Sequence, residues 1–166
     1  MRRIYYENAV YHITARGNNR RNILEESSEK EIFLKVVAKY QKRFSFKIYA
    51  YVLMDNHFHM LVECHRLHNI SKVMQPILLA YSCHYRNRHN YIGHVWQGRF
   101  NSKVIEGENY IVECINYIHF NPVKAKMIND AASYGWSSAK IYDGKIENDG
   151  IVNVIKSDQY TSSVTH

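Results

Sequence analysis

The sequence contains few cysteines and no long apolar segment, and both absences restrict what the chain can be. Its three cysteines, Cys64, Cys83 and Cys114, lie far apart and form no Cys-x-x-Cys pair. This spacing argues against a zinc cluster or a disulfide framework and predicts reduced thiols. No apolar run approaches the length of a membrane span, and residues 1–7 lack the apolar region of a signal peptide. We therefore expect a cytoplasmic protein without a membrane partner.

The chain also has fewer acidic than basic residues. The 166 residues include 22 lysines and arginines against 15 aspartates and glutamates, which gives a net charge of +7 with histidine neutral. This excess favours a polyanionic partner, although a basic surface kept for solubility is the simpler alternative. The apolar fraction of 46% indicates a folded chain, and the length suits one domain.

The spacing of apolar residues predicts the element order β-α-β-β-α-β-α. The expected strands cover residues 9–15, 47–54, 57–63 and 98–105. The expected helices cover residues 29–43, about 70–88 and 108–120, the last ending at Asn121-Pro122. The first six elements match the ferredoxin-like split β-α-β arrangement, an α+β fold that has an antiparallel sheet with helices on one face.

Capping and turn residues set the expected boundaries of these elements. Ser27 or Ser28 can cap the first helix, and Asn69 or Ser71 can cap the second. Asp55-Asn56 is typical of a two-residue hairpin turn, because both residue types tolerate a positive φ.

The chain becomes polar after residue 142. We expect one domain over residues 1–142, followed by a tail or loosely packed extension over 143–166. A short strand over residues 151–155 is the only regular element that the extension indicates.

Two histidines separated by one apolar residue form the leading candidate site. His57 and His59 lie on one face of the predicted strand, because side chains alternate across a strand. Phe58, Met60 and Val62 then point to the core. Two imidazoles that face the same way can bind one divalent cation. A single His-x-His pair is nevertheless weak evidence, since such pairs occur in many strands.

The last predicted helix carries a polar stripe that could complete this site. Glu113, Tyr117 and Asn121 are four residues apart and share a helical face. They present a tyrosine with two oxygen-bearing side chains. The chain has 14 tyrosines, so packing or surface exposure is the plain alternative for any one of them.

Five segments in a fixed order resemble the HUH family of single-stranded DNA transposases, in its REP-associated tyrosine transposase branch. One departure is Asp55, where the family pattern leads us to expect proline. The matching segments, which lie within residues 1–142, are 9–20, 50–63, 96–102, 117–124 and 134–138.

The resemblance implies a metal-dependent endonuclease and strand transferase that acts on single-stranded or hairpin DNA. It assigns metal binding to His57 and His59, a further polar ligand to Asn121, and the nucleophile to Tyr117. The ion would be Mg²⁺ or Mn²⁺, and the products would be a 5′-phosphotyrosine and a free 3′-hydroxyl. The family includes monomers and homodimers, and both states stay open for this chain.

Cations interleaved with aromatic residues are the sequence features that suit contact with unpaired DNA. An amphipathic helix with a basic polar face is the alternative for most of them. The roles of Glu113 and His119 stay open, although His119 is expected to pack or to contact DNA. The predicted DNA contacts are Arg16, Asn18, Arg20, Arg21, Tyr85, Arg86, Arg88 and Arg99.

Two other functions compete with this one. The first is a catalytically idle nucleic-acid-binding domain of the same fold, and the second is an unrelated hydrolase in which the two histidines hold a metal that activates water. The spacing of Tyr117 and Asn121 disfavours the hydrolase, which needs no such tyrosine. The presence of His57, His59 and Tyr117 together disfavours the idle domain, which is free to lose them.

Overall fold

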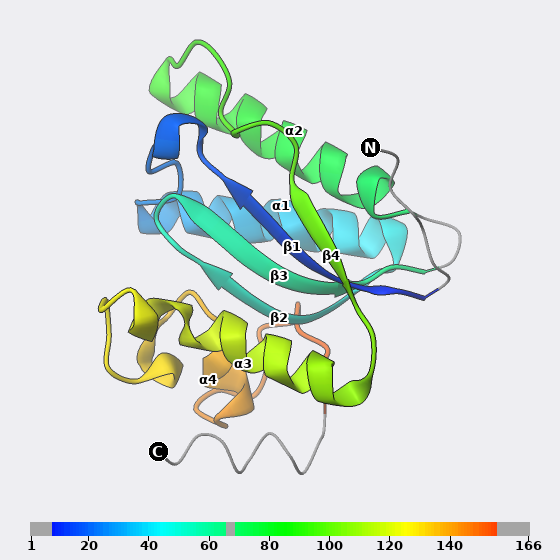
Figure 1. The fold of residues 1–166 in the computed structure, drawn as a ribbon. Coiled ribbons are helices and arrows are strands. Elements are labelled where there is room, and N and C mark those ends of the chain that lie inside the picture. The colour runs from blue at the N-terminus through cyan, green and yellow to red at the C-terminus, as the bar shows by residue number, and fades with distance from the viewer. Residues whose placement is uncertain (1–7, 66–68, 156–166) are drawn as a thin grey trace.

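A computed structural model describes residues 8–65 and 69–155 of the chain. The predicted order of the main elements is confirmed (Figure 1). They are β1 (Val10–Arg16), α1 (Ser27–Phe44), β2 (Lys47–Leu53), β3 (His57–Glu63), α2 (Ile70–His89), β4 (Asn101–Ile105) and α3 (Glu108–Lys124). Three short helices accompany them: η1 (Asn18–Arg20), η2 (Ala131–Ser133) and α4 (Ala139–Tyr142).

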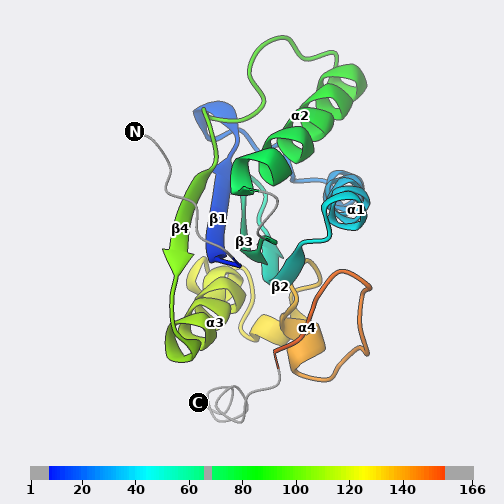
Figure 2. The same ribbon diagram turned by 90° about the vertical axis from the view of Figure 1, so that its right-hand side faces the viewer.

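The four strands form one sheet in the order β2-β3-β1-β4, and every neighbouring pair is antiparallel. This order confirms the ferredoxin-like split β-α-β fold. The helices α1 and α2 cover one face of the sheet, as expected, while α3 lies against the other (Figure 2). The sheet is therefore buried on both sides over part of its area.

Side-chain alternation along β3 divides the core into two layers. Phe58, Met60 and Val62 are completely buried and pack with residues of α1 and α2. Each such side chain stabilises the fold by roughly 1.5–3 kcal/mol relative to an exposed one. Leu61 points the other way, into a smaller cluster beneath α3 that includes Cys114, Ile115 and Ile118.

The start of α1 differs from the sequence-based expectation. Its N-cap is Glu26, which makes no side-chain capping hydrogen bond, so the prediction of Ser27 or Ser28 as the cap was wrong. The Ser28 hydroxyl donates to the Glu26 carboxylate instead. The prediction for α2 is confirmed, since the Asn69 side chain accepts from the Lys72 N–H at 2.9 Å.

The prediction that α3 ends at Asn121-Pro122 was also wrong. The helix continues to Lys124 with Pro122 buried inside it. A proline in the last turn removes one backbone hydrogen bond, and burial of its ring offsets part of that loss. Asn121 therefore keeps helical geometry one turn after Tyr117. The strand β4 is shorter than expected and begins at Asn101.

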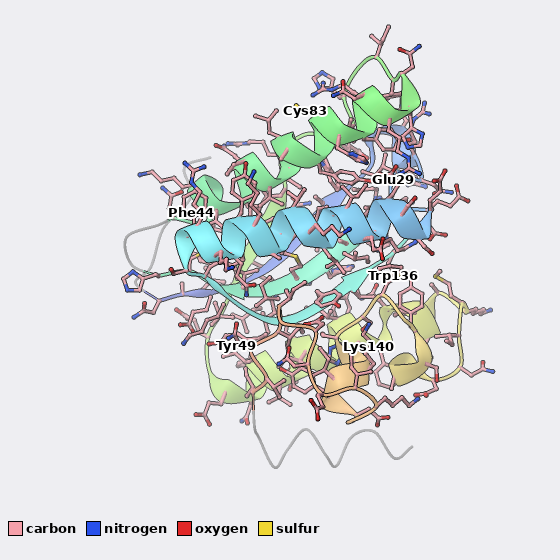
Figure 3. The ribbon with its side chains drawn as sticks, turned by 180° about the vertical axis from the view of Figure 1, so that it is seen from behind. Glu29, Phe44, Tyr49, Cys83, Trp136 and Lys140 are labelled. Carbon is pink, nitrogen blue, oxygen red and sulfur yellow. The ribbon has the colours of Figure 1, made fainter. Side chains whose placement is uncertain are left out.

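Later parts of the chain cover the free edge of β2, which would otherwise expose unpaired backbone groups. The Leu53 N–H donates to the Trp136 carbonyl at 2.8 Å, and Trp136 is labelled on this side of the molecule in Figure 3. Further along, the Asn153 N–H donates to the Ile48 carbonyl at 2.7 Å. The strand expected over residues 151–155 amounts to one bridge, between Ile48 and Val152. Residues 156–166 lie outside the described part.

Two expectations from composition can be compared with the structure. All three cysteines are free thiols, as predicted. None of the helices in residues 8–65 and 69–155 is long and apolar enough to cross a membrane.

Candidate active site

A polar cleft of about 440 Å³ lies where α3 crosses one end of the sheet. The strand register builds it, because His59 pairs with Thr14 and His57 pairs with Arg16, so all four side chains share a face. The cleft is lined by Thr14, Ala15, Arg16, His57, His59, Gln97, Arg99, Asn101, Tyr117 and Asn121.

The two histidines of β3 face the same way, as alternation predicts, and hydrogen bonds fix both rings. Their centroids are 5.2 Å apart. His57 Nδ1 lies 2.7 Å from Asn56 Oδ1, and His59 Nδ1 lies 2.9 Å from His12 Nε2. The amide oxygen of Asn56 can only accept, so the neutral His57 ring carries its proton on Nδ1 and its lone pair on Nε2.

The surroundings keep these imidazoles neutral. Burial, and then electrostatic interaction with His12, His57 and Arg16, lower the pKa of His59 to about 3. Burial and then Arg16 lower the pKa of His57. Burial and then Lys103 lower the pKa of His12. A neutral imidazole has a lone pair to offer, as metal binding requires.

The helix α3 brings a tyrosine to this pair. The Tyr117 ring stands edge-on to the rings of both His59 and His12, with a centroid separation of 5.7 Å in each case. Tyr117 is half exposed and lines the cleft, so its side chain is accessible to a ligand. Asn121 lines the same cleft and donates through Nδ2 to the Tyr117 carbonyl at 3.1 Å.

Two other residues of α3 lie away from the cleft. His119 is buried on the opposite side of the helix, where its Nε2 lies 2.6 Å from Ser138 Oγ and its ring contacts Tyr142. Packing was one of the two roles expected for His119 from the sequence, the other being contact with DNA. Glu113 is exposed and does not line the cleft, so the predicted stripe contributes Tyr117 and Asn121 alone.

Contacts with Leu24 and Lys30 stabilise the turn before His57. The predicted two-residue hairpin at Asp55-Asn56 is confirmed, since the Met54 N–H donates to the His57 carbonyl at 2.9 Å, although neither residue of the turn has a positive φ. The carbonyl of Asp55 accepts from the Leu24 N–H at 2.8 Å, and its carboxylate binds Lys30 Nζ at 2.9 Å. A proline at position 55 could not make this ion pair.

We expect Asp55→Ala to lower the free energy of unfolding by about 2 kcal/mol, because it leaves the buried Lys30 ammonium with the Glu25 carbonyl but without a carboxylate. The Lys30 side chain is only 4% exposed, whereas that of Asp55 is 40% exposed. Urea denaturation measures the change. The double variant Lys30→Met/Asp55→Ala should regain most of the loss, and a double variant less stable than Asp55→Ala would contradict the explanation.

A second backbone contact fixes the loop that forms the outer wall of the cleft. The Gln97 N–H donates to the Arg16 carbonyl at 2.8 Å, so residues 95–97 lie against the end of β1. Gly17 is needed there, since a Cβ at this position would lie 2.2 Å from the Arg21 carbonyl oxygen. The wall of the cleft is therefore attached to the strand that carries Arg16.

Four of the predicted DNA contacts lie in the cleft or beside it. Arg16 and Arg99 line the cleft, and Asn18 and Arg20 lie in η1 beside it. The Arg21 guanidinium lies 4.6 Å above the Tyr91 ring, which fixes its direction. Arg86 lines a neighbouring pocket.

Tyr85 is buried in the core, and Arg88 links α2 to the start of α1 through ion pairs. Tyr85 is 7% exposed, and its ring lies 4.3 Å from that of His89. Arg88 binds the buried carboxylate of Glu29 at 3.1 Å, and it binds the exposed carboxylate of Glu26 at the same distance. Glu29 is labelled in Figure 3, where α1 begins beneath α2. For both residues, contact with DNA stays a prediction.

The sequence did not indicate the role of several residues in and beside the cleft. His12 is a satisfied histidine, since its Nε2 lies 2.9 Å from His59 Nδ1, and this contact holds the ring of His59. Alternation along β1 from Arg16 through Thr14 to His12 could have indicated it. Gln97 gave no such signal, because the path of its loop depends on tertiary contacts, and Asn101 reaches the cleft because the first residue of β4 pairs with Thr14 of β1.

Comparisons with known proteins give a consistent result. The sequence profile of a family described as "Transposase IS200 like" matches residues 5–121. The chain is similar to a REP-associated tyrosine transposase bound to a REP hairpin, with a TM-score of 0.75, 19% identity, and coverage of 95% of this chain and 93% of that one. It is also similar to a putative transposase from Deinococcus radiodurans R1, with a TM-score of 0.51, 14% identity and coverage of 71% and 94%. No protein of curated function matches the sequence.

Proposed function

The chain belongs to the IS200-like transposase family of DNA-cleaving and DNA-joining enzymes, and from this premise we propose that it cuts single-stranded DNA through a covalent bond to Tyr117. The observation that carries this proposal is the position of the Tyr117 ring, edge-on to His59 in the cleft that also holds His57. The nucleophile and two potential metal ligands come from one chain. The proposed chemistry therefore requires no residue from a second copy.

We propose that His57, His59 and Asn121 hold a divalent cation, Mg²⁺ or Mn²⁺. The donor set fits such an ion, because both imidazoles are neutral and the Nδ1 of each is engaged by a neighbouring side chain. The described residues contain no cluster of three or more His, Cys, Asp or Glu side chains suited to a metal, so an amide ligand is needed. Imidazole ligands favour Mn²⁺ over Mg²⁺. When bound, the ion would polarise the scissile phosphate.

The side chains of the cleft have defined tasks in this proposal. Arg16 and Arg99 bind phosphate oxygens and orient the strand. The Tyr117 oxygen attacks phosphorus in line, so a bond from that oxygen to phosphorus forms while the bond to the 3′ oxygen breaks. The phenol loses its proton, and the departing 3′ oxygen gains one. The new phosphodiester retains the bond energy, so a 3′-hydroxyl can reverse the step without ATP.

We propose that the substrate is single-stranded DNA flanked by a hairpin. A REP hairpin is bound to the similar transposase structure, and the net charge of +7 suits such a ligand. Exposed cations beside the cleft, including Arg20, offer further phosphate contacts.

A labelled hairpin with single-stranded flanks, taken from the DNA around the gene, tests the proposal. With Mn²⁺ we expect a protein–DNA adduct that survives a denaturing gel, and with chelator we expect none. Tight binding without an adduct over a panel of hairpins would support the idle binding domain. Cut DNA without an adduct would support the hydrolase.

A further inference from the structure

A second pocket, of about 270 Å³, lies between α2 and the loop of residues 94–100. The apolar part of its lining includes Trp96 and Phe100, which are almost completely buried, and Gln75 and Ser82 add polar groups. The Trp96 indole N–H donates to the Leu78 carbonyl at 3.1 Å, which fixes the orientation of that ring. Leu79 is 61% exposed and forms the outer apolar side. An exposed leucine of this kind is available to a ligand.

The pocket also carries positive charge. Arg86 and Arg99 both contribute to its lining, and His94 adds an imidazole. The pocket therefore combines apolar side chains with cationic ones. A flat apolar ring that has polar edges and is linked to an anion would satisfy both parts.

The pocket adjoins the proposed active site. Arg99 lines both spaces, and Gln97 lines the cleft while Trp96 lines the pocket. The hydrogen bond from the Gln97 N–H to the Arg16 carbonyl attaches this loop to β1, so the spacing between the two spaces is set by the fold. Because Arg99 lines both spaces, a strand whose phosphate contacts Arg99 in the cleft lies beside the pocket.

We infer that this pocket binds one unpaired nucleobase of the DNA strand that is cut. The inference rests on the proposed function, since it takes the strand in the cleft as given. Its volume lies below the range of about 300–1,000 Å³ that is typical of drug-sized ligands, which suits a single base. Arg99 then binds the backbone between the base and the scissile phosphate. The pocket selects the position of the cut by holding a base at a fixed distance from Tyr117.

Two exposed apolar residues provide a matched test. Leu79 lines the pocket, whereas Ile92, which is 93% exposed, does not. Leu79→Glu and Ile92→Glu make the same change of charge on the surface. Fluorescence anisotropy with the hairpin DNA would measure affinity, and an abasic site would be placed in turn at each single-stranded position. Circular dichroism checks that each variant is folded.

We expect Leu79→Glu to weaken binding about tenfold, the typical effect of losing one base contact. One abasic position should weaken binding to the wild type by a similar factor and have no effect on Leu79→Glu. Ile92→Glu should bind within about twofold of the wild type and keep its sensitivity to that position. Arg86→Gln repeats the test from the edge of the pocket.

Two results would overturn the inference, and they are distinguishable. If the wild type forms the adduct but every abasic site weakens binding to the wild type and Leu79→Glu equally, the pocket holds no base. If the wild type forms no adduct on any hairpin, the proposed function fails and the inference fails with it.

Discussion

Replacing Tyr117 by phenylalanine is expected to abolish the covalent adduct and to lower cleavage by at least about 10³-fold, because the variant has no oxygen to attack phosphorus. DNA affinity should change by less than about threefold, since the ring remains and the arginines of the cleft are untouched. The tyrosine is half exposed, so stability should be nearly unchanged. Denaturing gels and anisotropy measure the two effects separately.

Tyr110→Phe is the matched control for this prediction. Tyr110 lies on the same helix, is 65% exposed and does not line the cleft. The identical substitution there should leave cleavage unchanged. Adduct formation by Tyr117→Phe at the wild-type rate would show that the nucleophile is another residue.

His57→Ala is expected to lower cleavage more than about 100-fold and to remove measurable Mn²⁺ binding, because it deletes one of two imidazole ligands. The turn before His57 keeps its backbone hydrogen bonds and the pair of Lys30 with Asp55, so the variant should fold. Isothermal titration calorimetry of the DNA-free protein with Mn²⁺ gives a readout that is independent of activity.

The control is His65→Ala, an exposed histidine just beyond the other end of β3. It should bind Mn²⁺ as the wild type does and cleave at the same rate. A His57→Ala protein with unchanged Mn²⁺ affinity and activity across a metal titration would rule out this ligand.

The sequence predicted the order of the elements and the face on which the histidines lie, because both follow from periodicity. Alternation predicted that His57 and His59 lie on the face of the strand opposite to that of Phe58. The spacing of four residues predicted that Tyr117 and Asn121 share one face of the helix. Both features hold in the structure. The prediction that the helix brings Tyr117 to the two histidines came from the family resemblance. Local spacing carries no information on how elements distant in sequence meet.

The features that the sequence did not indicate share a cause in tertiary contacts. Asp55 and Asn56 turn without a positive φ because the backbone of Leu24 and the ammonium of Lys30 hold the turn. Pro122 lies in the last turn of α3, where burial of its ring offsets part of the loss of one backbone hydrogen bond. His12 acquires its position from pairing between strands distant in sequence, and the pocket beside Trp96 depends on a loop without regular structure.

The most direct test is to identify the amino acid that carries the DNA. The adduct formed with Mn²⁺ would be digested with protease and nuclease, and the modified peptide sequenced by mass spectrometry. We predict that Tyr117 carries the 5′ phosphate of the downstream strand. DNA attached to any other residue, or through a 3′ phosphate, would contradict the proposed chemistry.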